Sequence, residues 1–141
     1  MTFLRDRQDV SPQLLGPGIP TVRARGGYLT PKRDFDAAWS NILFILGTLP
    51  GERLMNRRFG SRASEMLFDP NDTILASRLK RAIRDAIQTY EPRVLIEKLA
   101  VTANEQVVQI RFEFSLRGEL GSTRRGVGVA RGSGFRIVNQ F

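Results

Sequence analysis

The stretch Tyr90-Glu91-Pro92-Arg93 joins two segments with different hydrophobic periodicities. A proline cannot continue a helix, and it disfavours the helical conformation of the residue before it. We therefore expect the backbone to change here from helix to strand, which would hold Glu91 and Arg93 at a fixed corner. The simplest interpretation of these charges is an exposed pair that finishes the helix, and exposed pairs contribute little to stability.

The segment before this corner has the pattern of an amphipathic helix that ends near Tyr90. Residues 69–73 contain Asp, Pro, Asn and Thr, which are typical of a helix start. Apolar residues then recur at three- and four-residue steps, which predicts one buried face: Leu75, Leu79, Ala82, Ile83, Ala86, Ile87 and Tyr90. The other side is basic and carries Arg78, Lys80, Arg81 and Arg84. Such a face can lie on a phosphate backbone, but it is more often solvated.

The segment after the corner predicts an antiparallel hairpin. Residues 94–101 are rich in aliphatic and β-branched side chains, as strands are, and Asn104 lies in the expected turn. Apolar residues then alternate strictly with polar ones, so that one face lies on a core and the other meets water or a polar partner. The apolar set is Val108, Ile110, Phe112, Phe114 and Leu116.

The C-terminal part of the chain adds weaker strand signals. Residues 123–130 predict a third strand, although Gly126 and Gly128 weaken the pattern. Residues 135–138 are interpreted either as a last short strand or as a tail that pairs with another chain.

A first helix is expected from Asp34, a good N-cap residue, to Gly47. Its buried stripe is Phe35, Ala38, Trp39, Ile42, Leu43 and Leu46. A basic connector over residues 52–69 follows, with one helical turn near 64–67. Within it, Phe59-Gly60 indicates an aromatic anchor followed by a turn glycine.

The predicted fold is α+β, with two main helices packed on a small, mainly antiparallel sheet. Residues 34–141 are expected to form this single domain. Residues 1–33 are expected to form an extended N-terminal arm, because prolines and glycines are too frequent there for regular structure. The arm is either a disordered tail or a segment that becomes ordered against a neighbour through its few apolar residues.

Composition excludes several classes of site. The chain has 141 residues with 22 Lys and Arg, 14 Asp and Glu, a net charge of +8, and no His or Cys. Disulfides, thiolate metal sites and His-based catalysis are therefore excluded. The N-terminus lacks an apolar stretch of signal-peptide length, and the longest apolar run, residues 42–46, is too short to cross a bilayer.

Four short motifs follow one another along the chain: Leu49-Pro50-Gly51-Glu52-Arg53-Leu54-Met55, Phe59-Gly60, Leu67-Phe68-Asp69-Pro70 and Tyr90-Glu91-Pro92-Arg93. In this order and spacing they resemble the small baseplate wedge family of contractile phage tails. This family has been labelled tail-lysozyme-like and includes a baseplate component of type VI secretion systems. The resemblance runs from about residue 35 to about residue 116.

The resemblance implies a structural protein of the tail baseplate, assembled in the cytoplasm of the bacterial host. It implies that the connector packs beside the corner and that the corner docks on the helical core of the wedge. The residues implied in this docking are Glu91, Pro92, Arg93, Arg53 and Phe59. Expected partners are other wedge proteins and, through the arm, tail tube or hub proteins.

The resemblance also implies that the sheet is a template for the first ring of sheath proteins. Open strand edges can take up a strand of another chain. The residues assigned to this role are Gln109, Arg111, Glu113, Phe135 and Ile137. No catalytic residue, metal or cofactor is expected, and no membrane partner.

Two other functions are compatible with parts of the sequence. A nucleic-acid-binding module would explain the positive charge, but the chain has no recognition motif, so nucleic acid is disfavoured as a partner. A peptidoglycan hydrolase would need two carboxylates, one of them with a raised pKa. The motifs single out only Glu91, and a neighbouring Arg93 lowers the pKa of a carboxyl group, which is the wrong direction for a general acid.

Overall fold

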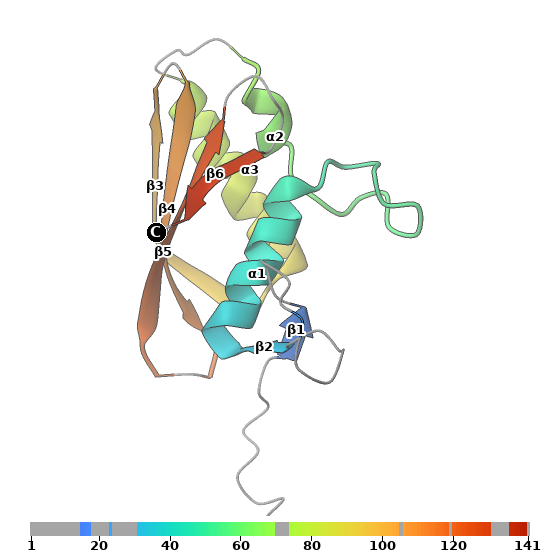
Figure 1. Cartoon of the computed structure of the whole chain (residues 1–141), viewed down its shortest axis with the longest axis vertical. Helices are drawn as coiled ribbons and strands as arrows, with labels where there is room; N and C mark the ends of the chain where they lie inside the picture. The colour runs from blue at the N-terminus through green and yellow to red at the C-terminus, as the bar shows by residue number, and fades with distance from the viewer. Residues whose placement is uncertain are drawn as a thin grey trace, which may run out of the picture.

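The computed structural model describes residues 15–17, 23, 31–69, 74–104, 106–118, 120–130 and 136–140. Three helices lie in these ranges: α1 (Asp34–Gly47), α2 (Ala63–Met66) and α3 (Leu75–Tyr90). They pack on one face of a sheet, and the other face of the sheet is open (Figure 1). The predicted α+β class is confirmed, as are the bounds of the first helix and the end of the long helix at Tyr90.

The main sheet has four antiparallel strands in the order of the chain: β3 (Val94–Ala103), β4 (Val107–Leu116), β5 (Ser122–Ala130) and β6 (Arg136–Gln140). The hairpin of β3 and β4 pairs Val94 with Leu116 and has a bulge between Ile96 and Lys98. β6 pairs with β5 of the same chain. The C-terminal segment is therefore a last strand of this chain's own sheet, and not a tail that pairs with another chain.

The alternating pattern of β4 is confirmed, since its apolar residues are buried beneath the helices. Trp39 of α1 meets Phe112 edge-on, with ring centroids 5.6 Å apart, and the ring centroids of Phe35 and Phe114 are 6.1 Å apart. The buried stripe of α3 reaches the same core, which joins both long helices and the sheet.

Two short strands precede α1. β1 (Leu15–Pro17) and β2 (Pro31–Arg33) pair antiparallel, with Pro17 opposite Pro31, and both contact α1 (Figure 1). The prediction that regular structure is absent from residues 1–33 is wrong for these six residues, because proline is tolerated at strand ends. Apart from Arg23, the rest of this segment lies outside the described residues.

From here on, the connector is the segment between α1 and α2, residues 48–62. It packs closely against the end of α1 at Gly60. The N–H of Ser61 donates to the carbonyl of Thr48 at 2.9 Å. Gly60 has φ of +123°, and a Cβ there would overlap that carbonyl. The predicted turn glycine is thus required both by its backbone angle and by this close approach.

No helix in the described part of the chain has both the length and the apolar character needed to cross a bilayer.

Gly60→Ala is expected to lower the free energy of unfolding by more than the roughly 1–3 kcal/mol of backbone strain alone, because the Thr48 carbonyl must also move. Gly51→Ala is the control: Gly51 has φ of +103°, but no atom lies within 4 Å of the position that its Cβ would take. Denaturant unfolding measures both losses. Equal losses in the two variants would show that the close approach at Gly60 has no energetic weight.

Candidate docking site

The corner begins where α3 ends. Glu91 has φ −134° and ψ 68°, which are not helical angles, and its N–H still donates to the carbonyl of Ile87 at 2.8 Å. Two residues after Pro92, the N–H of Val94 donates to the carbonyl of Glu91 at 3.0 Å and β3 starts. The corner is therefore a tight, hydrogen-bonded turn, as the proline predicts.

The side chain of Glu91 is buried, with only 3% of the residue exposed. Its Oε2 accepts a hydrogen bond from Nδ2 of Asn41 on α1 at 2.8 Å. Arg93 donates from Nε to Oε1 at 2.8 Å and from Nη2 to Oε2 at 3.3 Å. The pairing of Glu91 with Arg93 is confirmed, but the expectation of an exposed pair is wrong for Glu91, because α1 packs across the corner.

Arg93 stays accessible, with 56% of its side chain exposed, and Pro92 is exposed beside it. The carbonyl of Arg93 accepts a hydrogen bond from the N–H of Arg117 at 2.8 Å, which ties the corner to the end of β4. Arg93 is thus held at two points: its guanidinium by the carboxylate of Glu91, and its backbone by Arg117.

The connector packs against the same corner, as the family resemblance implies. The guanidinium carbon of Arg53 lies 4.2 Å from the centroid of the Phe59 ring. The Phe59 ring lies 5.0 Å from that of Tyr90, whose hydroxyl donates to the carbonyl of Arg58. Arg53, Phe59 and Glu91, which are distant in the sequence, line one small pocket of about 290 Å³.

The connector also forms a projecting loop, which leaves the body of the molecule next to α1 (Figure 1). The N–H of Gly51 donates to the carbonyl of Arg57 at 2.7 Å, and the N–H of Leu49 donates to Oε2 of Glu52 at 2.8 Å. These bonds define the loop, and Leu54 and Met55 are almost fully exposed within it. Two adjacent exposed apolar side chains on a structured loop are typical of a protein contact.

The residues assigned to the sheath are spread over the sheet. Gln109, Arg111 and Glu113 lie on β4, whose backbone is paired with β3 and β5. They can meet a partner only through side chains, because the open backbone edges belong to β3 and β6. Ile137 lies on β6 and is half-buried against the core, while Phe135 lies outside the described residues.

Glu113 is the centre of a charge cluster on this open face. Its Oε2 lies 3.2 Å from Nζ of Lys98, and its Oε1 lies 3.3 Å from Nη2 of Arg124. The hydrogen bond from Lys98 and the bond from Arg124 hold the pKa of Glu113 below its ordinary value, although partial burial acts in the opposite direction.

Comparison with known proteins gives the family. The sequence profile of the family described as baseplate wedge protein gp25 matches residues 39–123, which is more than half of the chain. The chain belongs to this family. All the residues of the corner and of the projecting loop lie within the match.

A known relative supports this family membership. The chain is 34% identical over 79 residues to baseplate wedge protein gp25 of Enterobacteria phage T4, and the match covers 52% of this chain and 58% of the phage protein. It thus spans less than two thirds of that relative.

Two solved structures share the fold. One is a Geobacter sulfurreducens protein described as a tail lysozyme, with a TM-score of 0.61 and 23% identity over 68% of this chain and 88% of that one. The other is a chain of the anti-feeding prophage baseplate, with a TM-score of 0.65 and 17% identity over 77% and 89%. At these identities the likeness concerns the fold alone.

Asn41 takes part in the corner, but the sequence patterns did not predict it. It lies 50 residues before Glu91, beside the apolar stripe of α1, and a polar residue there gives no signal of its own. Its role follows only from how α1 packs against the end of α3. Leu54 and Met55 belong to one of the family motifs, but their exposure could not be read from it.

Within the described ranges, no group of three or more acidic residues lies close enough together to hold a metal ion. Both carboxylate oxygens of Glu91 already accept hydrogen bonds from cationic or amide donors. The buried carboxylate of Glu91 therefore serves to position the exposed guanidinium of Arg93 for binding.

Glu91→Ala is expected to lower the free energy of unfolding by about 1–3 kcal/mol, because the donors on Asn41 and Arg93 lose a buried acceptor. Denaturant unfolding of the isolated chain, followed by circular dichroism, measures the loss. The matched control is Glu97→Ala, which removes an exposed carboxylate from β3 and is expected to stay within about 0.5 kcal/mol of the parent. A loss at Glu91 no larger than at Glu97 would contradict the structural role of the buried carboxylate.

Proposed function

We propose that this chain is a structural component of the baseplate wedge of a contractile tail or injection system. The observation that carries the proposal is membership of the wedge family together with a rigid corner whose charged groups converge on one surface. Its action is assembly without turnover. The description of one structural neighbour as a tail lysozyme does not favour hydrolysis, since 23% identity speaks only for a common fold.

The corner is proposed to dock on the helical core of the wedge. Arg93, Pro92 and Arg53 are exposed and supply the contacts, and Phe59 orients the guanidinium of Arg53. Glu91 is buried already in the single chain, so its role is to fix the direction of Arg93. A guanidinium held in place loses less conformational freedom when it pairs with a carboxylate of the partner, and a desolvated pair in an interface can contribute several kcal/mol.

The first sheath ring is proposed to add a strand to the open edge of β6, which has Ile137 on it. The unpaired N–H and C=O groups of an edge strand can bind an extended segment in this way. Gln109, Arg111 and Glu113 would contact the sheath protein through their side chains on the open face.

The remaining assignments follow from the wedge role. Residues 1–33 are proposed to form an arm that is anchored on α1 through β1 and β2 and reaches tail tube or hub proteins, and residues 34–141 a single wedge domain. The protein would be assembled in the host cytoplasm and would end in the tail baseplate.

The experiment that tests the docking is sedimentation of a tagged copy from producing cells in moderate salt, with mass spectrometry of the proteins that travel with it. The parent chain is expected in tail-sized particles with wedge and sheath proteins. Arg53→Glu is expected to reduce its share in these particles at least about tenfold, since reversing one interface charge commonly costs more than about 1.4 kcal/mol.

Arg84→Glu is the matched control, because it makes the same charge change at an exposed position of α3 away from the corner. Both variants are first shown to melt like the parent. Arg53→Glu entering the particles as well as Arg84→Glu would refute docking through the corner. A parent chain that sediments alone or with nucleic acid would refute the wedge function itself.

A further inference from the structure

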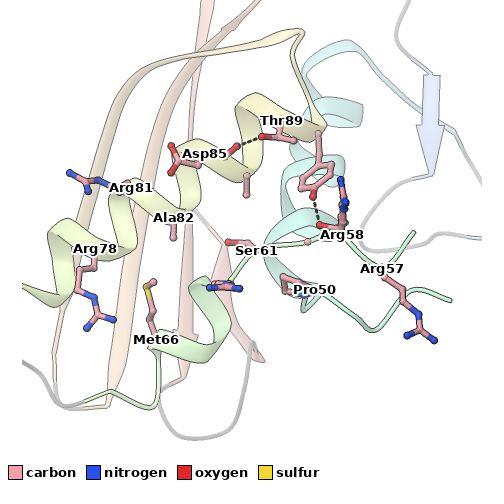
Figure 2. Close-up of a pocket in the computed structure, with 14 residues that line it drawn as sticks. Pro50, Arg57, Arg58, Ser61, Met66, Arg78, Arg81, Ala82, Asp85 and Thr89 are labelled. Atoms are coloured by element: carbon pink, nitrogen blue, oxygen red, sulfur yellow. Dashed lines mark hydrogen bonds between the residues drawn. The ribbon is translucent and has the colours of Figure 1, made fainter. Parts of the chain in front are cut away.

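A second surface lies on the other side of Tyr90 from the corner. It is a groove of about 680 Å³ between α3 and the segment from the connector to α2 (Figure 2). Tyr90 lines both this groove and the corner pocket, and no other described residue is shared between them. The wedge-core proposal makes no use of this groove.

The rim of the groove is strongly basic. In the part of the chain that the structure describes, five arginines line it, against a single acid, Asp85: Arg57, Arg58, Arg62, Arg78 and Arg81. Arg78 is paired with Asp69 at 3.3 Å. Within the described part of the chain, no carboxylate lies within ion-pair distance of the other four. Such a concentration of unneutralised guanidinium groups favours an anionic partner.

The floor of the groove is apolar and shallow. Ala82 and Ala86 line it from α3, and Met66 lines it from α2. Pro50 lies across the groove from Met66 (Figure 2). Small residues on a helix allow the backbone of a second helix to approach closely. Two further apolar side chains, Phe68 after α2 and Ile74 before α3, are exposed, although neither lines the groove.

The length of the groove fits a short helix. From Arg78 to Thr89 the lining follows α3 for eleven residue steps, which corresponds to about 16 Å, or three helical turns. An amphipathic helix of this length buries its apolar stripe on the floor, and acidic residues on its flanks then lie opposite the arginines.

The groove lacks what a nucleic acid would use. Among the described residues that line it, Tyr90 is the only aromatic one, and its ring packs on Phe59 while its hydroxyl donates to the carbonyl of Arg58. The described lining of the groove therefore offers no free ring to stack on a base. A phosphate backbone would also leave the apolar floor uncovered.

We propose that this groove binds an acidic amphipathic helix of a partner protein, over about three turns. Arg57, Arg58, Arg62 and Arg81 pair with its carboxylates, and Met66, Ala82 and Ala86 cover its apolar stripe. This surface is separate from the corner, so either interaction can hold without the other.

The test uses the full chain and a fluorescent peptide of about 14 residues, designed as an amphipathic helix with Leu on one face and Glu on both flanks. Fluorescence anisotropy in about 150 mM salt measures its affinity. Arg62→Glu and Arg81→Glu are each expected to weaken binding at least about tenfold. Ala82→Phe, which fills the floor without a change of charge, is expected to weaken it to a similar extent.

Arg84→Glu, an equal charge change on α3 that does not line the groove, is expected to change the affinity less than about threefold. Arg53→Glu at the corner is expected to do the same, which separates this site from the wedge-core site. All variants are compared after their melting curves are shown to match the parent.

Three results would overturn the proposal. One is equal binding of a peptide with the same composition in scrambled order, since this would mean attraction by charge alone. Another is equal weakening by Arg84→Glu and Arg81→Glu. The last is a parent chain that binds a single-stranded oligonucleotide but not the peptide, with this binding lost in Arg81→Glu and kept in Arg84→Glu. That result would assign the groove to nucleic acid.

Discussion

The buried carboxylate of Glu91 is the constraint on which the rest of the structure depends. A carboxylate removed from water is costly unless its oxygens are hydrogen-bonded and its charge is paired. Here the donors come from α1 and from the residue that leads into β3, while the backbone of Glu91 closes α3. Two helices and a strand must therefore be in place together before this group is satisfied, and the geometry of the corner follows from that requirement.

The same constraint gives Glu91 and Arg93 different roles. The carboxylate of Glu91 is buried and holds the guanidinium of Arg93 in position, while that guanidinium is exposed and can bind a partner. The connector adds a second exposed guanidinium, Arg53, oriented by an aromatic stack that ends on Tyr90. Tyr90 also separates the corner from the basic groove beside α3. One helix end thus organises two neighbouring surfaces, and this is consistent with a protein that holds several partners in an assembly.

Sequence patterns predicted the parts of the fold that depend on local periodicity. The stripe of α3, the alternation in β4 and the stop at Pro92 each arise within a few residues, so they could be read directly. The burial of Glu91 could not, because it depends on Asn41, 50 residues away on another helix. The pairing of β6 and the central place of β4 in the sheet were also beyond local patterns, since both are decided by which strands come together. Family motifs grouped Arg53, Phe59 and Glu91, but only the packing of the chain showed which of them are available to a partner.

The most direct test of this account is a double-mutant cycle between Asn41 and Glu91, measured as free energies of unfolding of the isolated chain. If the Asn41 amide and the Glu91 carboxylate stabilise the corner through their hydrogen bond, the losses in Asn41→Ala and Glu91→Ala will not add, and the coupling energy will be about 1–2 kcal/mol. Losses that add within about 0.3 kcal/mol would contradict the account. The amide of Asn41 would then not stabilise the corner, and the carboxylate would be fixed by Arg93 alone.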